Sequence, residues 1–469
     1  MGTEALTLTH ILITYGIIII TGALVFTAIS HMLYQKRSPT SMISWLLAVV
    51  FLPYITIPLY FLIGIRKRND KKAKSYVVFS EEKHPNSVES SQHTLLEVLR
   101  KNGIPPATSG NRYEIITSDV EAFNTMLSEI EQSQKSIDIC TYVFADDQTT
   151  KILLEALTQR AKAGVKVRIL IDIAGSLGVY FRQKPFKALR KAGGEVAFFV
   201  PVFKKPFQSY INLRNHRKIY LFDQTRVLSG GMNLSNEYMG NNDGSKRWKD
   251  ILYKLEGPAV YHFYTIFMND WIYATGKAEM IIPQKMLKQE GENIVQVVPS
   301  GPDIPRDALY EALLSTIYSA KERIWIVTPY FVPDDNIMQA LIIAQHRDVD
   351  IKLITPRKSN HLIADIGRSP YMRELEEAGV DLQLYEGDML HAKAILVDTT
   401  GGMIGSVNLD NRSLFLNYEI VTFAYSEELI QQIEVWMLEL MKDASSNLKA
   451  PSKAREALEN LMKVFAPLL

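Results

Sequence analysis

Two short motifs in this chain carry residues of the right type and spacing to bind and attack a phosphate group. His216 and Lys218 lie two positions apart at the start of an apolar run, and His391 and Lys393 do the same further along the chain. Successive side chains of a strand point to opposite faces, so the members of each pair share a face. Because burying an imidazole and an ammonium without a partner costs free energy, we expect both pairs to face a ligand.

The two motifs belong to a longer internal repeat. Each copy has the pattern H-x-K-x4-D followed by a glycine and an asparagine, and an offset of 175 positions separates the corresponding residues: His216 and His391, Lys218 and Lys393, Asp223 and Asp398, Gly230 and Gly405, and Asn233 and Asn408. One such motif arises readily by chance. Two copies in register, each followed by the same glycine and asparagine, indicate one site built from two halves.

The donor set fits an anion better than a metal ion. Zinc is the usual rival for a buried histidine, but an ammonium two residues away repels a cation, and no thiol or carboxylate completes a tetrahedral set. The two lysines, with Asn233 and Asn408, can instead donate hydrogen bonds to the oxygens of one phosphate, which leaves the imidazoles in line on its opposite sides. We therefore expect a phosphate site without a metal or a cofactor.

This arrangement predicts a covalent mechanism. One neutral histidine attacks phosphorus and forms a phosphohistidine, while the other, protonated, gives its proton to the leaving alkoxide. A carboxylate on the second ring nitrogen would fix the tautomer of a histidine, and Asp250 and Glu419, each after the Gly/Asn turn of its copy, are the candidates. Asp223 and Asp398 close their motifs where the strand gives way to a turn, and we expect mainly structural roles for them.

The composition is that of an ordinary globular protein. The 469 residues are 47% hydrophobic and 22% charged, which is enough chain for two or three domains. A net charge of +1 argues against a broadly basic nucleic-acid binder. Cys140 is the only cysteine, which excludes an intramolecular disulfide and a cysteine-based zinc site, so the bulk of the chain suits a reducing compartment.

The first 65 residues are far more apolar than the rest. Residues 10–33 form an apolar run long enough to span a bilayer, and no basic segment precedes it, which argues against a signal peptide. Residues 42–65 form a second run, interrupted by Pro53 and Pro58, which we interpret first as a kinked spanning helix. A re-entrant hairpin is the alternative, because proline frees backbone groups that must find other partners.

Basic residues flank the apolar runs. Residues 66–74 contain six lysines or arginines and one acid, and such clusters stay on the cytoplasmic side and attract anionic lipids. We therefore expect the rest of the chain to lie in the cytosol. Lys36 and Arg37 lie between the two runs. If the second run is a hairpin, both basic clusters face one side and the amino terminus lies across the membrane.

Beyond residues 75–110, a polar stretch that we interpret as a linker, strand-like and helix-like segments alternate. The first copy has strand patterns at residues 136–144, 165–172, 195–200 and 218–223, with helix patterns at 150–164 and 185–194. The second copy repeats this order between residues 323 and 398. The alternation predicts an α/β fold with mixed, largely parallel sheets flanked by helices.

The first copy also carries an insertion, at residues 200–215, that the second copy lacks. It is basic and aromatic and contains no acid; its notable residues are Lys204, Lys205, Phe207, Tyr210 and Arg214. Contact with anionic headgroups at a membrane surface and an ordinary solvated loop are equal alternatives for it.

The carboxyl-terminal residues 451–469 predict an amphipathic helix that ends in an apolar tail. Leu458, Leu461, Met462 and Phe465 recur at helical spacing. We expect this helix to pack against the rest of the chain rather than to contact the membrane.

With their flanking residues, the two motifs resemble the phospholipase D superfamily and, within it, the bacterial cardiolipin synthases. The similar segments extend along essentially the whole chain: NHRK, GGMNLSNEY, RWKD, EGPAV and NDW in the first half, and VVPSGPD, TPYFVPD, HAKAILVD, GSVNLDNRS and LNYE in the second. Lys249 stands where the family often has arginine, and Ser406 where it often has threonine. Neither difference removes a donor of the motif.

The resemblance implies two phospholipase D-like domains related by a pseudo-twofold axis, at residues 111–290 and 291–469, behind a membrane region at 1–74 with two helical segments. It implies transfer of a phosphatidyl group from one phosphatidylglycerol to another with release of glycerol, with His216 as the nucleophile and His391 as the acid and base. The expected location is the inner membrane of a bacterium, crossed more than once, with the catalytic domains on the cytoplasmic side and an anionic membrane as partner. A homo-oligomer is left open.

The same residues could serve other functions. With water or another alcohol as acceptor, the chain would be a membrane-bound phospholipase D that releases phosphatidic acid, or a different phosphatidyltransferase. The membrane segments favour a lipid substrate, and the absence of a long basic stripe with aromatic platforms argues against nucleic acid. A catalytically silent lipid-binding scaffold is disfavoured, because all six His, Lys and Asp positions of the two motifs are present.

Overall fold

The structure is a computed structural model, and it describes residues 2–34, 39–63, 94–199, 212–241, 247–277, 279, 281, 288–304, 306–446, 448 and 450–465. The basic cluster at 66–74, most of the insertion at 200–215 and the last four residues lie outside these ranges. So do Lys36 and Arg37.

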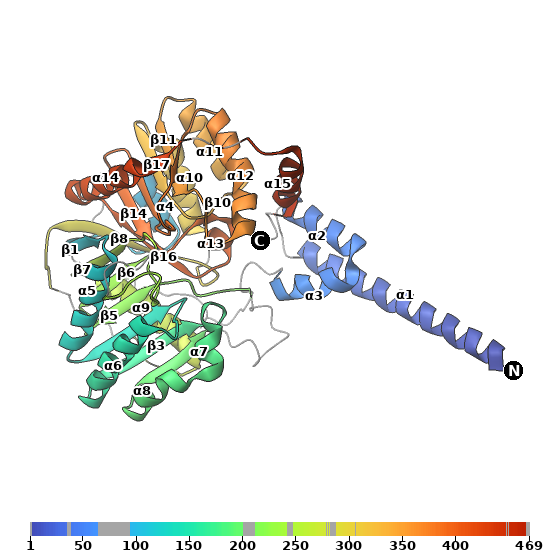
Figure 1. Cartoon of the computed structure of the whole chain (residues 1–469), viewed down its shortest axis with the longest axis horizontal. Helices are drawn as coiled ribbons and strands as arrows, with labels where there is room; N and C mark the ends of the chain where they lie inside the picture. The colour runs from blue at the N-terminus through green and yellow to red at the C-terminus, as the bar shows by residue number, and fades with distance from the viewer. Residues whose placement is uncertain are drawn as a thin grey trace.

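The apolar amino-terminal segment forms three helices: α1 (Gly2–Tyr34), α2 (Pro39–Phe51) and α3 (Pro53–Ile63). Residues 12–34 of α1 are long and apolar enough to cross a membrane, and they are the one such span in the described part of the chain. Figure 1 shows α1 projecting away from the rest of the molecule. Its apolar side chains are mostly exposed, which fits a membrane span better than the core helix of a globular domain.

Residues 42–65 do not form the single kinked spanning helix that the sequence led us to prefer. The helix breaks at Leu52, and α2 and α3 pack against each other and against α1. Thr21 Oγ1 lies 2.8 Å from Tyr54 Oη, and His31 Nδ1 lies 2.9 Å from Tyr60 Oη, so α3 runs beside α1 in the same direction. The α2–α3 pair is therefore the alternative hairpin, and each arm, at roughly 16–20 Å, is too short to span a bilayer.

The rest of the chain forms one mixed sheet of 15 strands with helices packed on it (Figure 1). The first copy of the repeat supplies seven strands: β1 (Thr108–Ile116), β2 (Ser136–Thr141), β3 (Lys166–Asp172), β4 (Glu195–Phe199), β5 (Ile219–Phe222), β6 (Arg226–Gly230) and β7 (Leu252–Glu256). The second copy supplies eight: β8 (Asn293–Ser300), β9 (Arg323–Val327), β11 (Asp350–Pro356), β12 (Asp381–Tyr385), β13 (Ala394–Val397), β14 (Gly401–Gly405), β16 (Glu419–Ala424) and β17 (Ala444–Ser445). A separate small sheet pairs β10 (Phe331–Val332) with β15 (Leu409–Asp410).

The strand order of the second copy mirrors that of the first. Along the sheet the order is β17-β12-β11-β9-β13-β14-β16-β8-β1-β7-β6-β5-β2-β3-β4, so β1 and β8 join the two copies at the centre. The motif strands β5 and β13 hold equivalent places in this order. The predicted strands and their sequence of occurrence are confirmed in both copies.

The expectation of a largely parallel sheet was wrong. Crossover helices place β2, β3 and β4 parallel to one another, and likewise β9, β11 and β12. The other described pairings in the large sheet are antiparallel, because the strands that carry and follow the motifs return through tight turns, as β5 does to β6 and β13 to β14.

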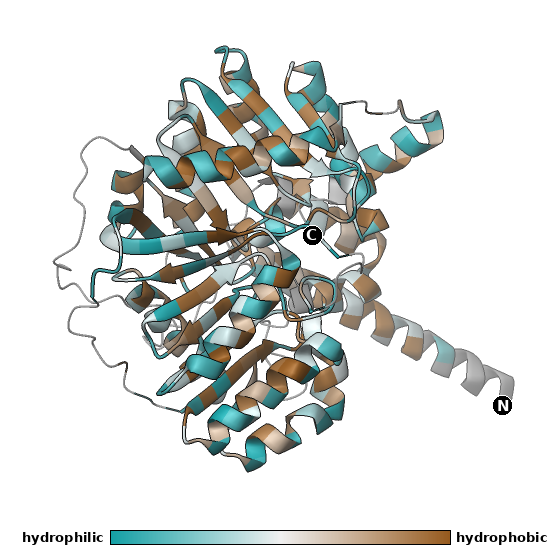
Figure 2. Ribbon diagram, turned by 60° about the vertical axis from the view of Figure 1, so that its left-hand side comes forward, coloured by the Kyte–Doolittle hydropathy of each residue, from teal (hydrophilic) through white to brown (hydrophobic). Residues whose placement is uncertain are grey.

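Helices connect and cover these strands. In the first copy and at its borders they are α4 (Thr94–Lys101), α5 (Asp119–Gln132), α6 (Gln148–Lys162), α7 (Leu177–Arg182), α8 (Lys187–Lys191) and α9 (Val260–Thr275), with 3₁₀ turns η1 (Ala174–Ser176) and η2 (Lys184–Phe186). In the second they are α10 (Ala308–Ser319), α11 (Asp335–Gln345), α12 (Leu362–Glu377), α13 (Asn411–Phe415), α14 (Glu427–Lys442) and α15 (Lys453–Phe465). Figure 2 shows hydrophobic residues gathered along the strands and hydrophilic residues on the outer faces of the helices.

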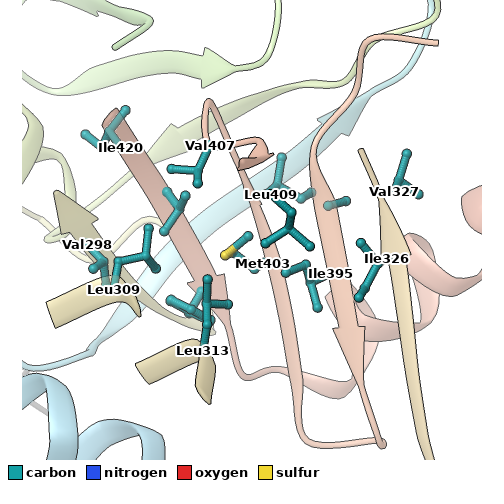
Figure 3. Close-up of a cluster of buried hydrophobic side chains, with 14 of the residues drawn as sticks. Val298, Leu309, Leu313, Ile326, Val327, Ile395, Met403, Val407, Leu409 and Ile420 are labelled. Atoms are coloured by element: carbon teal, nitrogen blue, oxygen red, sulfur yellow. The ribbon is translucent and has the colours of Figure 1, made fainter. Parts of the chain in front are cut away.

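The two copies share a hydrophobic core. Figure 3 shows part of it in the second copy, where Leu309 and Leu313 of α10 face Met403 of β14. The same cluster of buried side chains continues into the first copy through Tyr253 and Phe263. The relative position of the two motifs is therefore fixed by packing rather than by a flexible connection.

Part of the expected linker is folded. Residues 94–101 of the predicted linker form α4 and residues 108–110 begin β1, and Leu99 of α4 is fully buried in the shared core. The run TLLEVLR places apolar residues at helical spacing, which the polar average of residues 75–110 hides. The domain boundaries at 111 and 291 stay predictions.

Candidate active site

The four basic residues of the two motifs are buried beside the sheet. His216 and Lys218 immediately precede β5, and His391 and Lys393 precede β13, so the mirrored strand order brings equivalent strand ends together. All four residues are at most 9% exposed. Lys218 interacts electrostatically with Lys393 and with the carboxylates described below, which places both pairs in one site.

Backbone pairing between the copies positions each histidine. The N–H of His216 donates to the carbonyl of Tyr418 at 2.8 Å, and the N–H of His391 donates to the carbonyl of Lys249 at 2.7 Å. Isolated β-bridges join Asn215 to Tyr418, and Lys249 to Leu390. Each histidine thus lies beside the residue that precedes the candidate carboxylate of the other copy.

The two carboxylates pair with the histidines crosswise. His216 Nδ1 lies 3.0 Å from Glu419 Oε2, and His391 Nδ1 lies 2.7 Å from Asp250 Oδ2. Each carboxylate accepts from Nδ1, so Nε2 is the ring nitrogen that each imidazole can present to a ligand. Nε2 of His391 lies 3.0 Å from Lys393 Nζ and 3.5 Å from Tyr238 Oη, so a ligand there would replace or share these contacts. The sequence identified both acids as orienting groups, but it did not indicate that each serves the histidine of the opposite copy.

Burial keeps both imidazoles neutral. It lowers the pKa of His391 to about 3, with Lys393 adding to the effect, and it lowers the pKa of His216 although Glu419 opposes it. The carboxylates stay ionised: burial acts to raise the pKa of Asp250 and Glu419, but the neighbouring lysine and histidine outweigh it in each case and hold the pKa below its usual range. The site thus combines neutral nitrogen nucleophiles with fixed negative groups behind them.

The two lysines have lowered pKa values. Burial lowers the pKa of Lys218 to about 7 and that of Lys393 to about 8, while nearby carboxylates limit the shift. Lys218 Nζ donates to the carbonyl of His216 at 2.8 Å, and Lys393 donates to the carbonyl of His391. Lys393 Nζ also lies 2.8 Å from His391 Nδ1. A phosphate anion here would favour the charged form of both lysines.

The asparagines of the repeat lie in the loops after β6 and β14. Asn233 Oδ1 accepts from the backbone N–H of Val143 at 3.1 Å, and Asn408 Nδ2 donates to Ser413 Oγ at 3.3 Å. Asn408 Oδ1 is buried and has no hydrogen-bond partner among the described residues. Their expected role as donors to a phosphate stays a prediction.

Asp223 and Asp398 do not reach the cluster of histidines and lysines. They lie at the opposite ends of β5 and β13, roughly 20 Å from the histidines that begin the motifs. The carboxylate of Asp223 accepts from the backbone N–H groups of Lys135 and Ser136 at 2.6 and 3.1 Å. Asp398 accepts from Glu322 and Arg323 in the same way, so both aspartates tie the end of the motif strand to the start of the neighbouring strand.

Aromatic side chains that the sequence did not single out surround the histidines. The ring of Tyr142 meets that of His216 edge-on, with centroids 4.8 Å apart. Tyr238 and Trp248 lie 5.1 and 5.3 Å from His391, measured between ring centroids. Tyr238 and Trp248 occur in the flanking segments GGMNLSNEY and RWKD. The sequence alone does not distinguish an aromatic residue that lines the site from one that packs in the core.

Arg217, between the histidine and lysine of the first motif, is the second group that the sequence missed. Its side chain is fully buried, with Nη1 2.7 Å from Asp270 and Nη2 2.9 Å from Asp303. Its Nε donates to the carbonyl of Glu419 at 3.0 Å. The second motif has Ala392 at this position, so the two halves of the site are not identical.

The donors fit an anion rather than a metal. Two ammonium groups lie within the cluster, and the described residues contain no group of three or more His, Cys, Asp or Glu side chains that could hold a metal ion. Chemically, the arrangement can accept one phosphate between the two imidazoles, attack it from one side and exchange a proton on the other.

Comparison with known proteins agrees with this chemistry. The family model described as "Cardiolipin synthase, PLD-like domain" matches residues 126–271 and 313–441, and one described as "Phospholipase_D-nuclease N-terminal" matches residues 23–64. Cardiolipin synthase 1 of Bacillus cereus is 31% identical over 93% of this chain and 90% of its own length. Cardiolipin synthase of Geobacillus kaustophilus is 32% identical over the same shares.

One solved structure supports the fold alone. A phosphatidylserine synthase from Haemophilus influenzae is 14% identical, with a TM-score of 0.62 over 80% of this chain and all of that one. At that identity the similarity concerns architecture rather than activity.

Proposed function

The chain belongs to the cardiolipin synthase family, whose members carry phospholipase D-like domains, and from this premise we propose that it joins two phosphatidylglycerol molecules into cardiolipin and glycerol. The observation that carries the proposal is the crosswise pairing of His216 with Glu419 and of His391 with Asp250 around two buried lysines. That arrangement offers one anion two oriented imidazoles.

In the first step, His216 Nε2 attacks the phosphorus of one phosphatidylglycerol. The bond from phosphorus to the oxygen of the headgroup glycerol breaks, and that oxygen takes a proton from His391, so that glycerol leaves and a phosphatidyl-histidine remains. Because both imidazoles are neutral without a ligand, His391 takes up this proton from solvent when the negative phosphate binds and raises its pKa, and it returns a proton to solvent when the product leaves.

In the second step, a hydroxyl of the headgroup of another phosphatidylglycerol enters. His391, now neutral, removes the hydroxyl proton while the oxygen attacks phosphorus, and the bond to His216 breaks. The two steps consume two phosphatidylglycerols and release one cardiolipin and one glycerol, and the protein returns to its starting state. No cofactor is needed for this balance.

A pseudo-twofold axis through the site is part of the proposal. The mirrored strand order, the matched bridges from each histidine to the other copy, and the matched aspartates at the far strand ends support it. Such an axis would place the phosphate on it, with one imidazole on either side.

For the membrane region, we propose that α1 spans the bilayer and that the α2–α3 hairpin re-enters from the side on which α1 ends. Lys36 and Arg37 precede the hairpin and the basic residues 66–74 follow it, which supports a cytoplasmic position for both its ends and for the catalytic body. Protease added to intact spheroplasts should then remove an amino-terminal tag and spare a carboxyl-terminal one. The opposite pattern would refute this orientation.

Product analysis tests the reaction. Purified protein is incubated with phosphatidylglycerol labelled in its headgroup, and lipids and water-soluble products are separated. Cardiolipin with equimolar glycerol supports the transferase, whereas phosphatidic acid with glycerol and no cardiolipin would show a hydrolase. His216→Ala and His391→Ala should both abolish product.

Trapping distinguishes the two histidines. With phosphatidylglycerol labelled in its acyl chains, the His391→Ala protein should take up acid-labile label slowly, because no acid protonates the leaving glycerol, and should then retain it, because no base activates the second alcohol. The His216→Ala protein should take up no label. The reverse pattern would exchange the two roles while leaving the reaction itself intact.

A further inference from the structure

Exposed apolar side chains of the catalytic body are concentrated in three segments. Outside α1–α3, ten large apolar side chains of the described residues are exposed, and six of them lie in α7, at the start of α12 and in α15: Leu177, Phe181, Leu362, Ile363, Leu458 and Leu461. Isolated apolar residues on a surface need no explanation, but clusters of them mark contact sites.

The α7 segment lies at the rim of the site on the side of His216. Ser176, just before α7, donates to the carbonyl of Tyr142 at 3.0 Å, and Tyr142 packs against His216. The next residue, Leu177, is 50% exposed, and Phe181 one turn later is 66% exposed. These two side chains therefore point outward from an element that also supports the wall of the site.

The start of α12 has the same relation to His391. The ring of Tyr330 lies 6.5 Å from that of His391 and 6.0 Å from that of His361, and its hydroxyl donates to Asn360. Leu362 and Ile363 follow at once and are 74% and 65% exposed. Helix α7 follows β3 and helix α12 follows β11, and these two strands hold equivalent places in the two copies. The repeat thus presents an exposed apolar pair at both rims of the site.

Helix α15 packs through a charged residue and leaves two of its leucines exposed. Glu459 is fully buried against α12, where it pairs with Arg373 and, at 2.8 Å, with Arg455. Leu458 and Leu461 are 45% and 53% exposed. The sequence predicted packing against the rest of the chain, which is confirmed, but a soluble amphipathic helix would bury its leucines rather than its glutamate.

Basic residues accompany the apolar ones. Arg182, Lys184, Lys187, Arg190 and Lys191 line one shallow hollow of the α7–α8 segment, together with Gln183 and without an acid. Apolar side chains beside a cluster of basic ones are the pattern of an element that lies in the headgroup layer of an anionic bilayer.

We propose that α7, the start of α12 and α15 form an interfacial surface that docks on the anionic bilayer leaflet next to the hairpin, so that the mouth of the site rests on the membrane. In Figure 1 the three elements lie on the side of the body that faces α1–α3. The proposal rests on the proposed function only for the identity of the lipid taken up. It means that substrate enters by lateral movement within the leaflet rather than through water.

Site-specific probes test the docking in the full-length protein. Cys140 is buried, so an environment-sensitive fluorophore can be attached to an introduced cysteine at Leu177→Cys, Ile363→Cys or Leu461→Cys. The matched control is Val435→Cys on α14, which is 57% exposed and outside the three segments. In vesicles of phosphatidylglycerol and phosphatidylcholine with brominated acyl chains, the three probes should be quenched and the control should not. Equal quenching at all four positions, or at none, would overturn the proposal.

Charge substitutions test its consequence. The pairs Leu177→Glu with Phe181→Glu, and Leu362→Glu with Ile363→Glu, should lower kcat/KM on vesicles about tenfold or more, because two carboxylates oppose insertion. The control pair is Val435→Glu with Leu438→Glu. On short-chain phosphatidylglycerol dissolved as monomers, all three variants should match the unmodified protein.

The two assays separate the possible failures. If the test pairs lose no more activity on vesicles than the control pair does, the interfacial surface is refuted. It is also refuted if the test pairs lose as much activity on monomeric substrate as on vesicles. Absence of cardiolipin from the unmodified protein with either substrate refutes the proposed function instead, and the quenching experiment still decides the docking.

Discussion

Glu419, in the second copy of the repeat, lies 3.0 Å from Nδ1 of His216 in the first copy. Asp250 of the first copy lies 2.7 Å from Nδ1 of His391 in the second, so the exchange is mutual. Neither copy contains both a histidine and the carboxylate that orients it. The site therefore exists only when the two copies are packed on each other, and their shared hydrophobic core holds them in this position.

Neutralising either carboxylate should slow the reaction without unfolding the protein. Asp250→Asn and Glu419→Gln keep the shape of the side chain but present an amide to Nδ1, which favours the wrong tautomer of the histidine. We expect kcat to fall by about 10²–10⁴-fold. Cardiolipin formation by variants with unchanged melting temperatures measures this.

The exposed Glu428→Gln on α14 is the control for removing one negative charge, and it should leave kcat unchanged. If Asp250→Asn or Glu419→Gln also retained full activity, the crosswise pairs would have no part in the chemistry.

The sequence predicted the motif strands and the repeat, and it singled out the two histidines, the two lysines and the two carboxylates that the structure brings together, because each has a local signal: a two-residue period, a fixed offset, or an acid after a Gly/Asn turn. It could not predict which acid meets which histidine. The pairing of acids with histidines depends on how β1 and β8 join the two copies in one sheet. These strands are 180 residues apart in sequence, so no local pattern reports their pairing. Arg217 was missed for the same reason, since its partner Asp303 belongs to the other copy.

Two other errors have local causes. The antiparallel return of β5 into β6 follows from the tight turn at Asp223 and Gln224, both with positive φ, whereas our expectation gave more weight to the alternation of strands and helices. The hairpin of α2 and α3 depends on Pro53 beginning a new helix rather than kinking an existing one. The sequence is consistent with both outcomes, because proline is found at the first position of helices and at kinks.

The equivalent positions Gly231 and Ser406 should respond differently to alanine. A Cβ on Gly231 would lie 2.1 Å from Asp250 Oδ1, so Gly231→Ala must displace the carboxylate that orients His391. A shift of that size should lower kcat about 10²-fold. Ser406→Ala removes one hydrogen bond to Glu419 and should lower kcat about tenfold or less. Steady-state cardiolipin synthesis measures kcat of the two variants. An equal loss of kcat in both would show that a Cβ at position 231 does not displace Asp250.

Activity should decline on the alkaline side as the lysines lose their protons. Burial lowers the pKa of Lys218 to about 7 and that of Lys393 to about 8 in the empty site, so the charged forms that attract a phosphate are lost as pH rises through this range. The inflection in this range does not belong to the histidines of the empty site, because burial moves the pKa of both downward. We expect kcat/KM to fall across this range while kcat, which reports the occupied site, falls at higher pH.

Binding of dimethyl phosphate, a phosphodiester that stays a monoanion across this range, followed by calorimetry at several pH values, checks the same point without turnover. Affinity that did not change between neutral and alkaline pH would show that the two ammonium groups do not hold the anion.

Asp223→Asn should affect stability more than chemistry. The carboxylate accepts hydrogen bonds from the backbone N–H groups of residues 134–136, and an uncharged amide oxygen is a weaker acceptor. We therefore expect a loss of about 1–3 kcal/mol in the free energy of unfolding at neutral pH. Asparagine also tolerates the positive φ of 53° at this position. Activity per folded molecule should stay near that of the unmodified protein.

The pH dependence of this loss has a definite sign. Burial acts to raise the pKa of Asp223, but the backbone donors outweigh it and lower the pKa below its usual value. The carboxylate therefore stabilises the fold above its unfolded pKa, and the contribution disappears as pH falls through the folded pKa. Melting curves of both proteins should converge in acid. A constant difference at all pH values would mean that the charge is not responsible.

Arg217→Met should destabilise the joint between the two copies. Methionine fills a similar volume, but it leaves Asp270 and Asp303 buried without the cation that lies 2.7 and 2.9 Å from them. Burial already raises the pKa of Asp303 although Arg217 opposes it, so removing the arginine should leave a carboxyl that takes up a proton or opens the site to water. We expect a loss of about 3–5 kcal/mol in the free energy of unfolding, measured by denaturant titration in detergent.

Arg112→Met is the matched control, because Arg112 pairs with Glu256 on the surface at 3.1 Å and is 53% exposed in its side chain. It should cost less than about 1 kcal/mol. The buried arginine also donates to the carbonyl of Glu419, so its loss should reduce cardiolipin synthesis even in the molecules that remain folded, while Arg112→Met should not. Equal stability of the two variants would show that the buried pairs across the copies contribute no more than a surface pair, and that packing of the shared core alone holds the site together.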